Sequence, residues 1–188
     1  LVQCLIRTKN FVPTVKTLQK ALAGAHEDLM DFLINTLLDQ QPEFKPDFSH
    51  CALSGEIDFV KRIVVEKNQT PDLSWLLCAI FSGNVSLVKY LIETFALDPR
   101  KIDLWKLPEP HIAMKPYLFC HVPMAKFLIE EHGCIPIQRR FEDYIRGNNL
   151  PLARYLITEC GFKFQDDLLG DMKPNNYFEN IWLDRGPF

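Results

Sequence analysis

The sequence predicts an all-α fold, a right-handed stack of about five helical hairpins. Three observations predict it: a ten-residue segment recurs along the chain, each copy has apolar pairs at helical spacing, and a shorter apolar stretch precedes each copy. We call the first residue of each copy its anchor. Recurrence at periods of 20–50 residues is typical of solenoid proteins. The anchors are Ala25, Gly55, Gly83, Cys120 and Asn148.

The recurring segment predicts the second helix of each hairpin. Apolar pairs follow the anchor at four and five residues and again at eight and nine, which places them on one helical face. Only a neighbouring hairpin can cover that face, so at least three hairpins must stack. The pairs are Leu29/Met30 with Leu33/Ile34, Phe59/Val60 with Ile63/Val64, Leu87/Val88 with Leu91/Ile92, Met124/Ala125 with Leu128/Ile129, and Leu152/Ala153 with Leu156/Ile157.

The stretch before each anchor predicts a shorter first helix. Gly or Asn at an anchor suits a tight turn, because both residues tolerate left-handed backbone. Pro123 and Pro151 fall in the first turn of a second helix, where proline costs least. Asn84 lies in a glycosylation sequon at a helix start, and we interpret it as structural. The apolar residues seven positions before the anchors are Leu18, Phe48, Leu76, Ala113 and Phe141.

The predicted stack covers residues 14–160, between two ends of different character. We expect residues 1–13 to form an N-terminal cap or the end of a preceding element, and residues 161–188 to form a C-terminal capping tail. The longest anchor spacing indicates an insertion near residues 97–111, which includes Trp105. Insertions in solenoids often lie on the binding face. The alternative is that Trp105 folds back over the apolar seam.

Residues 51–61 (Cys-Ala-Leu-Ser-Gly-Glu-Ile-Asp-Phe-Val-Lys) resemble the paired small residues, glycine turn and second helix of an ankyrin repeat, and residues 79–92 resemble them too. The Thr-Pro-Leu-His opening of that family is absent, and several units are shortened. Generic helical-hairpin repeats are the alternative. The resemblance implies an ankyrin-like stack that binds a protein on its concave face. The degenerate repeats are similar to those of intracellular bacterial effectors and large DNA viruses, which implies a host protein as a candidate partner.

Composition excludes several classes of protein. The chain is 47% hydrophobic and 12% aromatic, which excludes a disordered chain. Its 21 basic and 24 acidic residues give a net charge of -3, so nucleic acid is not an expected partner. No apolar run is long enough for a membrane span. We expect reduced thiols and a cytoplasmic location, with host cytosol as one possibility, because no dense disulfide framework is evident. The cysteines are Cys4, Cys51, Cys78, Cys120, Cys134 and Cys160.

The sequence predicts no catalytic residue, no cofactor and no metal site. Cys120, His121, His132 and Cys134 are residue types that bind zinc, but their spacing is not that of a structural zinc site. Phosphate-binding loops and His-Glu-x-x-His are absent. The alternative is a hydrolase or transferase that uses this Cys/His cluster, which would require a reactive thiol of depressed pKa.

The resemblance also implies where a partner would bind. In an ankyrin-like unit, the residues six and two positions before the anchor project onto the concave surface. They are Gln19/Ala23, Ser49/Leu53, Leu77/Phe81, Met114/Leu118 and Glu142/Arg146, which form an apolar strip with polar ends. Such a strip suggests a protein contact. The predicted partner-binding residues are Leu53, Trp75, Leu77, Phe81, Trp105, Met114 and Leu118.

The predicted function is therefore that of a non-enzymatic protein–protein interaction module, an effector or adaptor. The alternative is a targeting or regulatory repeat domain of a larger enzyme, because a chain that begins at Leu1 is expected to be a piece of a longer protein. In that case, the tail or the rest of the protein would cover the strip. The sequence does not give the oligomeric state.

Overall fold

Helices hold most of the residues that the computed structural model describes, which are 12–102, 122–134 and 150–162. These ranges contain no strand, which confirms the all-α prediction for them. None of their helices is long and apolar enough to cross a membrane. The chain divides into two compact units, residues 1–104 and residues 105–188, and we describe each unit by itself. The expected N-terminal cap, insertion and tail lie largely outside the described residues.

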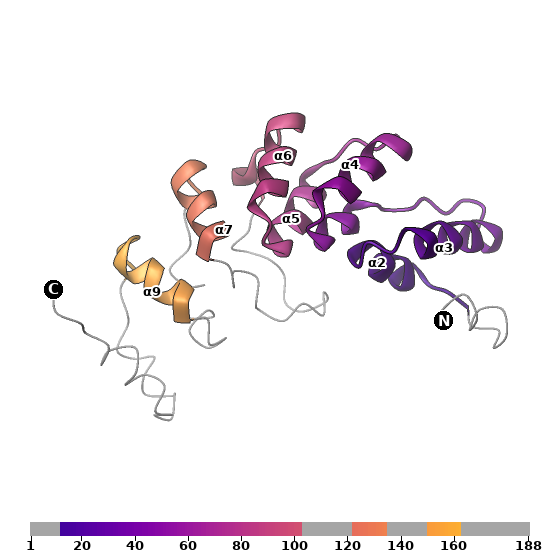
Figure 1. Cartoon of the computed structure of the whole chain (residues 1–188), viewed down its shortest axis with the longest axis horizontal. Helices are drawn as coiled ribbons and strands as arrows, with labels where there is room; N and C mark the ends of the chain where they lie inside the picture. The colour runs from indigo at the N-terminus through magenta and orange to yellow at the C-terminus, as the bar shows by residue number, and fades with distance from the viewer. Residues whose placement is uncertain (1–11, 103–121, 135–149, 163–188) are drawn as a thin grey trace, which may run out of the picture. The chain divides into compact units, whose positions relative to one another are not determined.

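The first unit contains three helical hairpins in chain order (Figure 1). Each pairs a first helix with a second one across a short turn, and the recurring segment supplies the second helix, as predicted. The first two pairs are α2 (Val15–Ala23) with α3 (Glu27–Gln40), and the 3-10 helix η1 (Ser49–Ser54) with α4 (Ile57–Glu66). The third is α5 (Leu73–Ser82) with α6 (Val85–Phe95), followed by the short 3-10 helix η2 (Pro99–Lys101).

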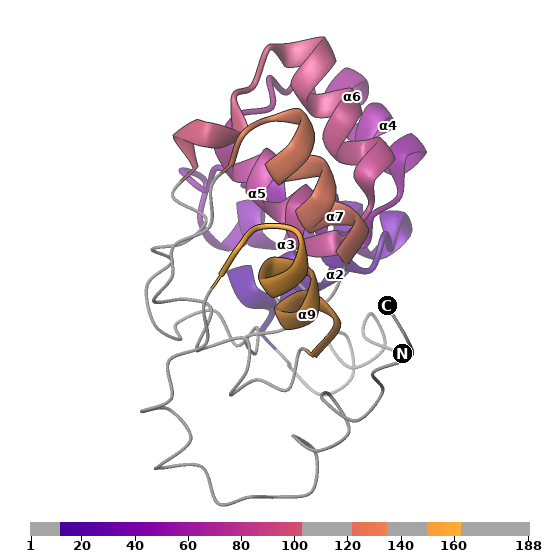
Figure 2. The same cartoon turned by 90° about the vertical axis from the view of Figure 1, so that its left-hand side faces the viewer.

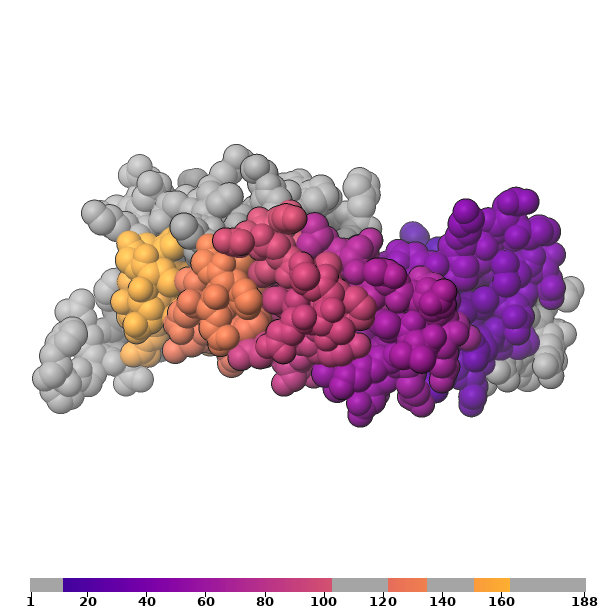
Figure 3. All heavy atoms as spheres, turned by 90° about the horizontal axis from the view of Figure 1, so that it is seen from above, coloured from indigo at the N-terminus to yellow at the C-terminus, as the bar shows by residue number. Residues whose placement is uncertain are grey.

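The three first helices of this unit form one layer, because η1 packs against both α2 and α5. The second helices pair with them, and α4 and α6 lie side by side in both cartoon views (Figures 1 and 2). In the space-filling view, the atoms of the three hairpins follow one another from indigo to pink (Figure 3). The layer of first helices thus has one side toward the second helices and one side away from them.

The core includes many of the apolar positions that the repeat predicts, whereas the residue nine positions after each anchor is only half-buried. In every recurring segment, the residues five and eight positions after the anchor are buried. The residues seven positions before the anchors are also buried: Leu18 in α2, Phe48 immediately before η1, and Leu76 in α5. Burial of one such side chain stabilises the fold by roughly 1.5–3 kcal/mol. The buried pairs in the second helices are Met30/Leu33, Val60/Ile63, Val88/Leu91, Ala125/Leu128 and Ala153/Leu156.

The turns within the hairpins repeat at atomic detail. Gly55 and Gly83 have φ of 73° and 78°, and Ala25 has φ of 52°, so all three anchors described have the predicted left-handed backbone. Ser54 precedes Gly55, and its hydroxyl donates to the Cys51 carbonyl at 2.7 Å and accepts from the Glu56 N–H at 3.1 Å. Ser82 makes the same two bonds around Gly83.

The ends of the second helices repeat as well. Asn68, Ala96, Gly133 and Gly161 each lie thirteen residues after an anchor, and each has a positive φ, of 47°, 53°, 66° and 70°. A left-handed residue that terminates a helix satisfies its last carbonyls. Helix α3 is the exception, because it continues to Gln40.

The second unit contains α7 (Val122–Lys126), which continues as the π-helical segment η3 (Phe127–Glu131), and α9 (Leu150–Thr158). Pro123 and Pro151 fall in the first turns of α7 and α9, as predicted. The Tyr155 hydroxyl of α9 donates to Glu130 Oε1 at 3.0 Å. Lys126 Nζ of α7 lies 5.3 Å from the Tyr155 ring centroid, and the same kind of contact occurs in the first unit, where Lys61 Nζ lies 5.1 Å from the Tyr90 centroid. The predicted first helices of this unit lie outside the described residues.

Candidate protein-binding face

The side of the first-helix layer that is turned away from the second helices is the candidate site. Helices α2 and α5 bury one stripe of side chains, and the opposite stripe remains at least partly exposed. We call this side of α2, η1 and α5 the inner face. It consists of Lys16, Gln19, Lys20, Ala23, His50, Leu53, Ser74, Leu77, Cys78 and Phe81.

The α5 end of the inner face is apolar. Leu77 and Phe81 are half-buried, as is Leu53 of η1. Helix α5 contains no charged residue, unlike every other α-helix in the described ranges. Surface helices of soluble domains normally place charged residues on their outer stripe. The outer stripe of α5 is instead suited to contact with another apolar surface.

The position of α5 is fixed at both ends by local interactions. Asp72 Oδ1 accepts the N–H groups of Ser74 at 2.9 Å and Trp75 at 3.4 Å, which caps the helix start. Partial burial opposes ionisation of Asp72, but the hydrogen bonds from Ser74 and Trp75 outweigh it and hold the pKa below its usual value. Gly83 ends the helix. Leu77 and Phe81 therefore project from a rigid element.

The α2 end of the inner face is cationic. Lys16 and Lys20 are exposed and four residues apart, which places them on one face of the helix. Neither ammonium group forms an ion pair with the part of the chain that the structure describes. Helix α2 contains no acidic residue. The inner face therefore changes from cationic on α2 to apolar on α5.

Two of the predictions about this surface are wrong. Trp75 is only 4% exposed. It is four residues before the buried Ala79 and so shares the core-facing side of α5. Ser49 is 2% exposed, because η1 is a 3-10 helix with three residues per turn and Ser49 lies over the buried Ala52.

The other predicted residues divide into two groups. The structure brings Leu53, Leu77 and Phe81 onto the inner face, beside Gln19 and Ala23. Trp105, Met114 and Leu118 lie outside the described residues, as do Glu142 and Arg146. The strip is thus defined for the first three hairpins.

A cluster of Asp47, Ser49, His50 and Cys78 has the residue types of nucleophilic catalysis. However, His50 Nδ1 is the atom nearest to both partners, at 3.9 Å from Asp47 Oδ2 and 3.5 Å from Ser49 Oγ. A catalytic histidine uses one ring nitrogen for the carboxylate and the other for the nucleophile. Burial raises the pKa of the Cys78 thiol to about 12, although a hydrogen bond with Ser49 opposes the rise. This geometry does not activate either nucleophile.

The Cys/His residues considered for zinc are not all described. His132 stacks edge-on against Phe127 with centroids 4.8 Å apart, and Cys134 is buried, whereas Cys120 and His121 lie outside the described ranges. Within those ranges, no group of three or more His, Cys, Asp or Glu residues is placed to hold a metal ion. Cys51, Cys78, Cys134 and Cys160 are thiols in this structure.

The sequence reasoning missed two regular features. Lys16 and Lys20 were detectable from their spacing of four on the stripe opposite Leu18 and Leu22. The left-handed helix ends were detectable because Asn68, Gly133 and Gly161 share one distance from their anchors. Ala96 gave no such signal, because alanine rarely adopts this backbone.

Comparisons of the chain with models of protein families, with curated proteins and with solved structures found no match.

Proposed function

We propose that the chain is a non-enzymatic protein–protein interaction module, built as an ankyrin-like stack of helical hairpins and acting in the cytoplasm. The observation that carries the proposal is the uncharged helix α5, which presents Leu77 and Phe81 beside Leu53 on the inner face. Aromatic and aliphatic side chains held on a rigid element are typical anchors of protein interfaces.

The repeated detail of the hairpins supports the ankyrin-like part of the proposal. The Ser54 and Ser82 turns share the same hydrogen bonds, and the first helices pack in one layer. A layer of this kind leaves one continuous surface for a partner. Cys51, fully buried between hairpins, serves as a small apolar residue, a use of cysteine that suits a reducing compartment.

The proposal is tested by affinity capture from cytosolic extract. The variant Leu77→Gln/Phe81→Gln removes the apolar anchors, and Val64→Gln/Val65→Gln on α4 makes the same change on a second helix, where Val65 is 77% exposed. We expect the unmodified chain and the α4 variant to retain a common partner and the α5 variant to lose it, with equal helical circular dichroism in all three. Equal capture by all three proteins would exclude the inner face as the binding site.

A further inference from the structure

We infer that the inner face selects a protein segment that has bulky apolar residues at one end and acidic residues at the other. The inference rests on the proposed function and specifies the chemistry of the partner. It is carried by the charge pattern of the inner face, where Lys16 and Lys20 lie on α2 and Leu77 and Phe81 lie on α5.

The two lysines occupy the positions on α2 that Ser74 and Cys78 occupy on α5. In both helices these residues are nine and five positions before the anchor, and in both they lie opposite the buried stripe. Because η1 packs between α2 and α5, Lys20, His50 and Cys78 form one row across the inner face. A partner lying along this row meets the cationic and the apolar end in turn.

A lysine at position 16 does not stabilise helix α2. Helix α2 begins at Val15, so Lys16 is in the first turn, where a cation opposes the helix dipole. Lys20 is in the last turn, where a cation is favourable. No carboxylate in the described ranges is paired with Lys16. A residue that is locally unfavourable and uncompensated is expected where function requires it.

Among the described residues, the carboxylates of Asp72 and Asp47 near the inner face are already engaged away from the two lysines. Asp72 is at the α5 end, and its carboxylate already accepts hydrogen bonds from Ser74 and Trp75. Asp47 precedes η1, and its Oδ1 accepts the Ser49 N–H at 2.9 Å. Within the part of the chain that the structure describes, the inner-face cations open to an acidic partner residue are therefore Lys16 and Lys20 on α2.

The spacing of the helices sets the length of the segment. Packed helices lie about 8–10 Å apart, so α2 and α5 are separated by roughly 16–20 Å across η1. An extended chain covers this distance in about five or six residues. We therefore expect a linear segment whose apolar residues and Asp or Glu residues are about that far apart.

The test is selection from a displayed library of random twelve-residue peptides on the full chain, followed by affinity measurements with individual selected peptides. We expect the selected peptides to combine large apolar residues with Asp or Glu. The variant Lys16→Glu/Lys20→Glu should weaken their binding about tenfold, and added salt should weaken it too. The matched variant Lys45→Glu/Lys101→Glu changes the net charge equally outside the inner face and should bind normally.

The outcomes separate the two proposals. The inference would be overturned by selected peptides that have no excess of Asp or Glu and bind the Lys16→Glu/Lys20→Glu variant as tightly as the unmodified chain. If those peptides fail to bind the Leu77→Gln/Phe81→Gln variant, the proposed function still stands. Peptides that bind the unmodified chain and all variants with equal affinity would overturn both this inference and the proposal that the inner face is the binding site. A library that yields no binding peptide would overturn the linear-segment inference.

Discussion

Left-handed residues close the second helices, and their identity differs between hairpins. Ala96 and Gly133 occupy the same position thirteen residues after an anchor, with φ of 53° and 66°. An L-residue in this region carries a cost of about 1–2 kcal/mol that glycine does not. A Cβ at Gly133 would meet no atom of the described residues within 4 Å, so we expect the cost there to be conformational.

Because Ala96 and Gly133 occupy equivalent positions, exchanging alanine and glycine should change the free energy of unfolding in opposite directions at the two sites. Ala96→Gly should raise the free energy of unfolding by about 0.5–1 kcal/mol, because relief of the backbone strain exceeds the added entropy of the unfolded chain. Gly133→Ala should lower it by a similar amount. Urea titration followed by circular dichroism measures both changes, and a shift of the same sign for both variants would refute the shared role.

Asn84 joins two hairpins through one side chain. Its Oδ1 accepts the Leu87 N–H at 3.1 Å and caps α6, while its Nδ2 donates to the Gly55 carbonyl at 2.6 Å. The structural interpretation of this sequon asparagine is thus confirmed.

The two bonds predict graded effects of substitution at Asn84. Asn84→Ala removes both and should destabilise the fold by about 1–2 kcal/mol. Asn84→Ser retains a capping oxygen and loses only the bond to Gly55, so its loss should be smaller. Thermal unfolding of the two variants gives the order, and an equal loss would mean that the bond to Gly55 contributes little.

The thiols of the first unit predict a pH dependence of stability. Burial raises the pKa of Cys78 to about 12 and that of Cys51 further still. The unfolded thiols ionise near pH 8.5, so between that pH and the folded pKa the unfolded chain releases protons that the folded chain keeps. The free energy of unfolding should therefore fall as the pH rises from 8 to 10.

The variant Cys51→Ala/Cys78→Ser should flatten this decrease. Urea unfolding at several pH values over that range, all at or below the usual pKa of tyrosine, measures the slope. A slope unchanged by the double variant would assign the alkaline loss to other groups.

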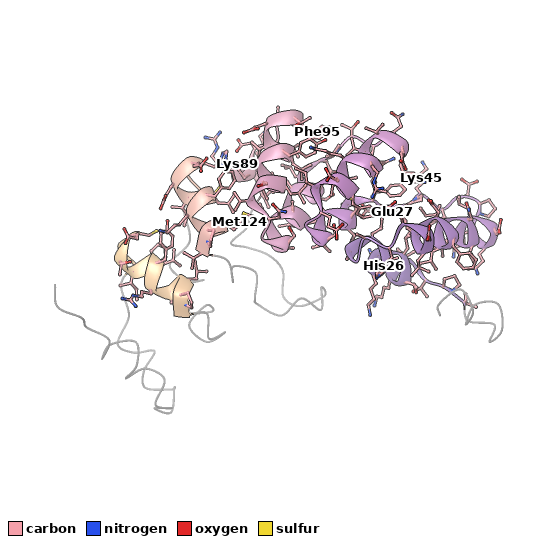
Figure 4. All side chains as sticks on the ribbon, viewed as in Figure 1. His26, Glu27, Lys45, Lys89, Phe95 and Met124 are labelled. Carbon is pink, nitrogen blue, oxygen red and sulfur yellow. The ribbon has the colours of Figure 1, made fainter. Side chains whose placement is uncertain are left out.

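At the scale of elements, neighbouring second helices are joined by contacts in a common register. Lys61 of α4 lies 5.1 Å from the Tyr90 centroid of α6, and Lys126 of α7 lies 5.3 Å from the Tyr155 centroid of α9. In each case the lysine is six residues after its anchor and the tyrosine seven after the next. Between α3 and α4, ion pairs replace this contact. Arg62 pairs with Glu27, and Lys67 Nζ lies 2.8 Å from Asp31 Oδ1. Glu27, at the start of α3, is labelled in Figure 4.

The register predicts a measurable coupling between α4 and α6. A double-mutant cycle with Lys61→Met and Tyr90→Leu should give a coupling energy of about 0.5–1 kcal/mol. Exposed ion pairs such as Arg62–Glu27 are worth about 0–1 kcal/mol. Unfolding free energies of the four proteins of the cycle provide the value, and additive effects would show that the lysine and the ring act independently.

At the scale of the whole molecule, the boundary between the two compact units follows Leu104. The first unit contains three hairpins, the smallest number expected to sustain a stack, and buries its own core. Residues 1–104 expressed alone should therefore be helical and unfold cooperatively. Circular dichroism with thermal melting tests this expectation, and a fragment without a cooperative transition would show that the first unit depends on residues 105–188.

Much of the helical architecture was predictable from the sequence, because apolar residues that recur at helical spacing are stable only on the buried side of a helix. The buried pairs Val60/Ile63 and Val88/Leu91 follow from that rule, and so do the turns at Gly55 and Gly83. The inner face was predictable only in part. Leu53, Leu77 and Phe81 lie there as predicted, whereas the prediction failed for Trp75 and Ser49.

The sequence by itself determined where the turns at Gly55 and Gly83 lie and which stripe each helix buries, since these depend on residues that are close together in the chain. Only the tertiary structure decided how the outer stripes of neighbouring first helices combine into one face. The 3-10 geometry of η1 turned Ser49 inward against α5, and the packing of α2, η1 and α5 in one layer placed Lys16 and Lys20 on the same face as Phe81. Neighbouring hairpins set these outcomes, and the periodicity of a single hairpin contains no information about its neighbours.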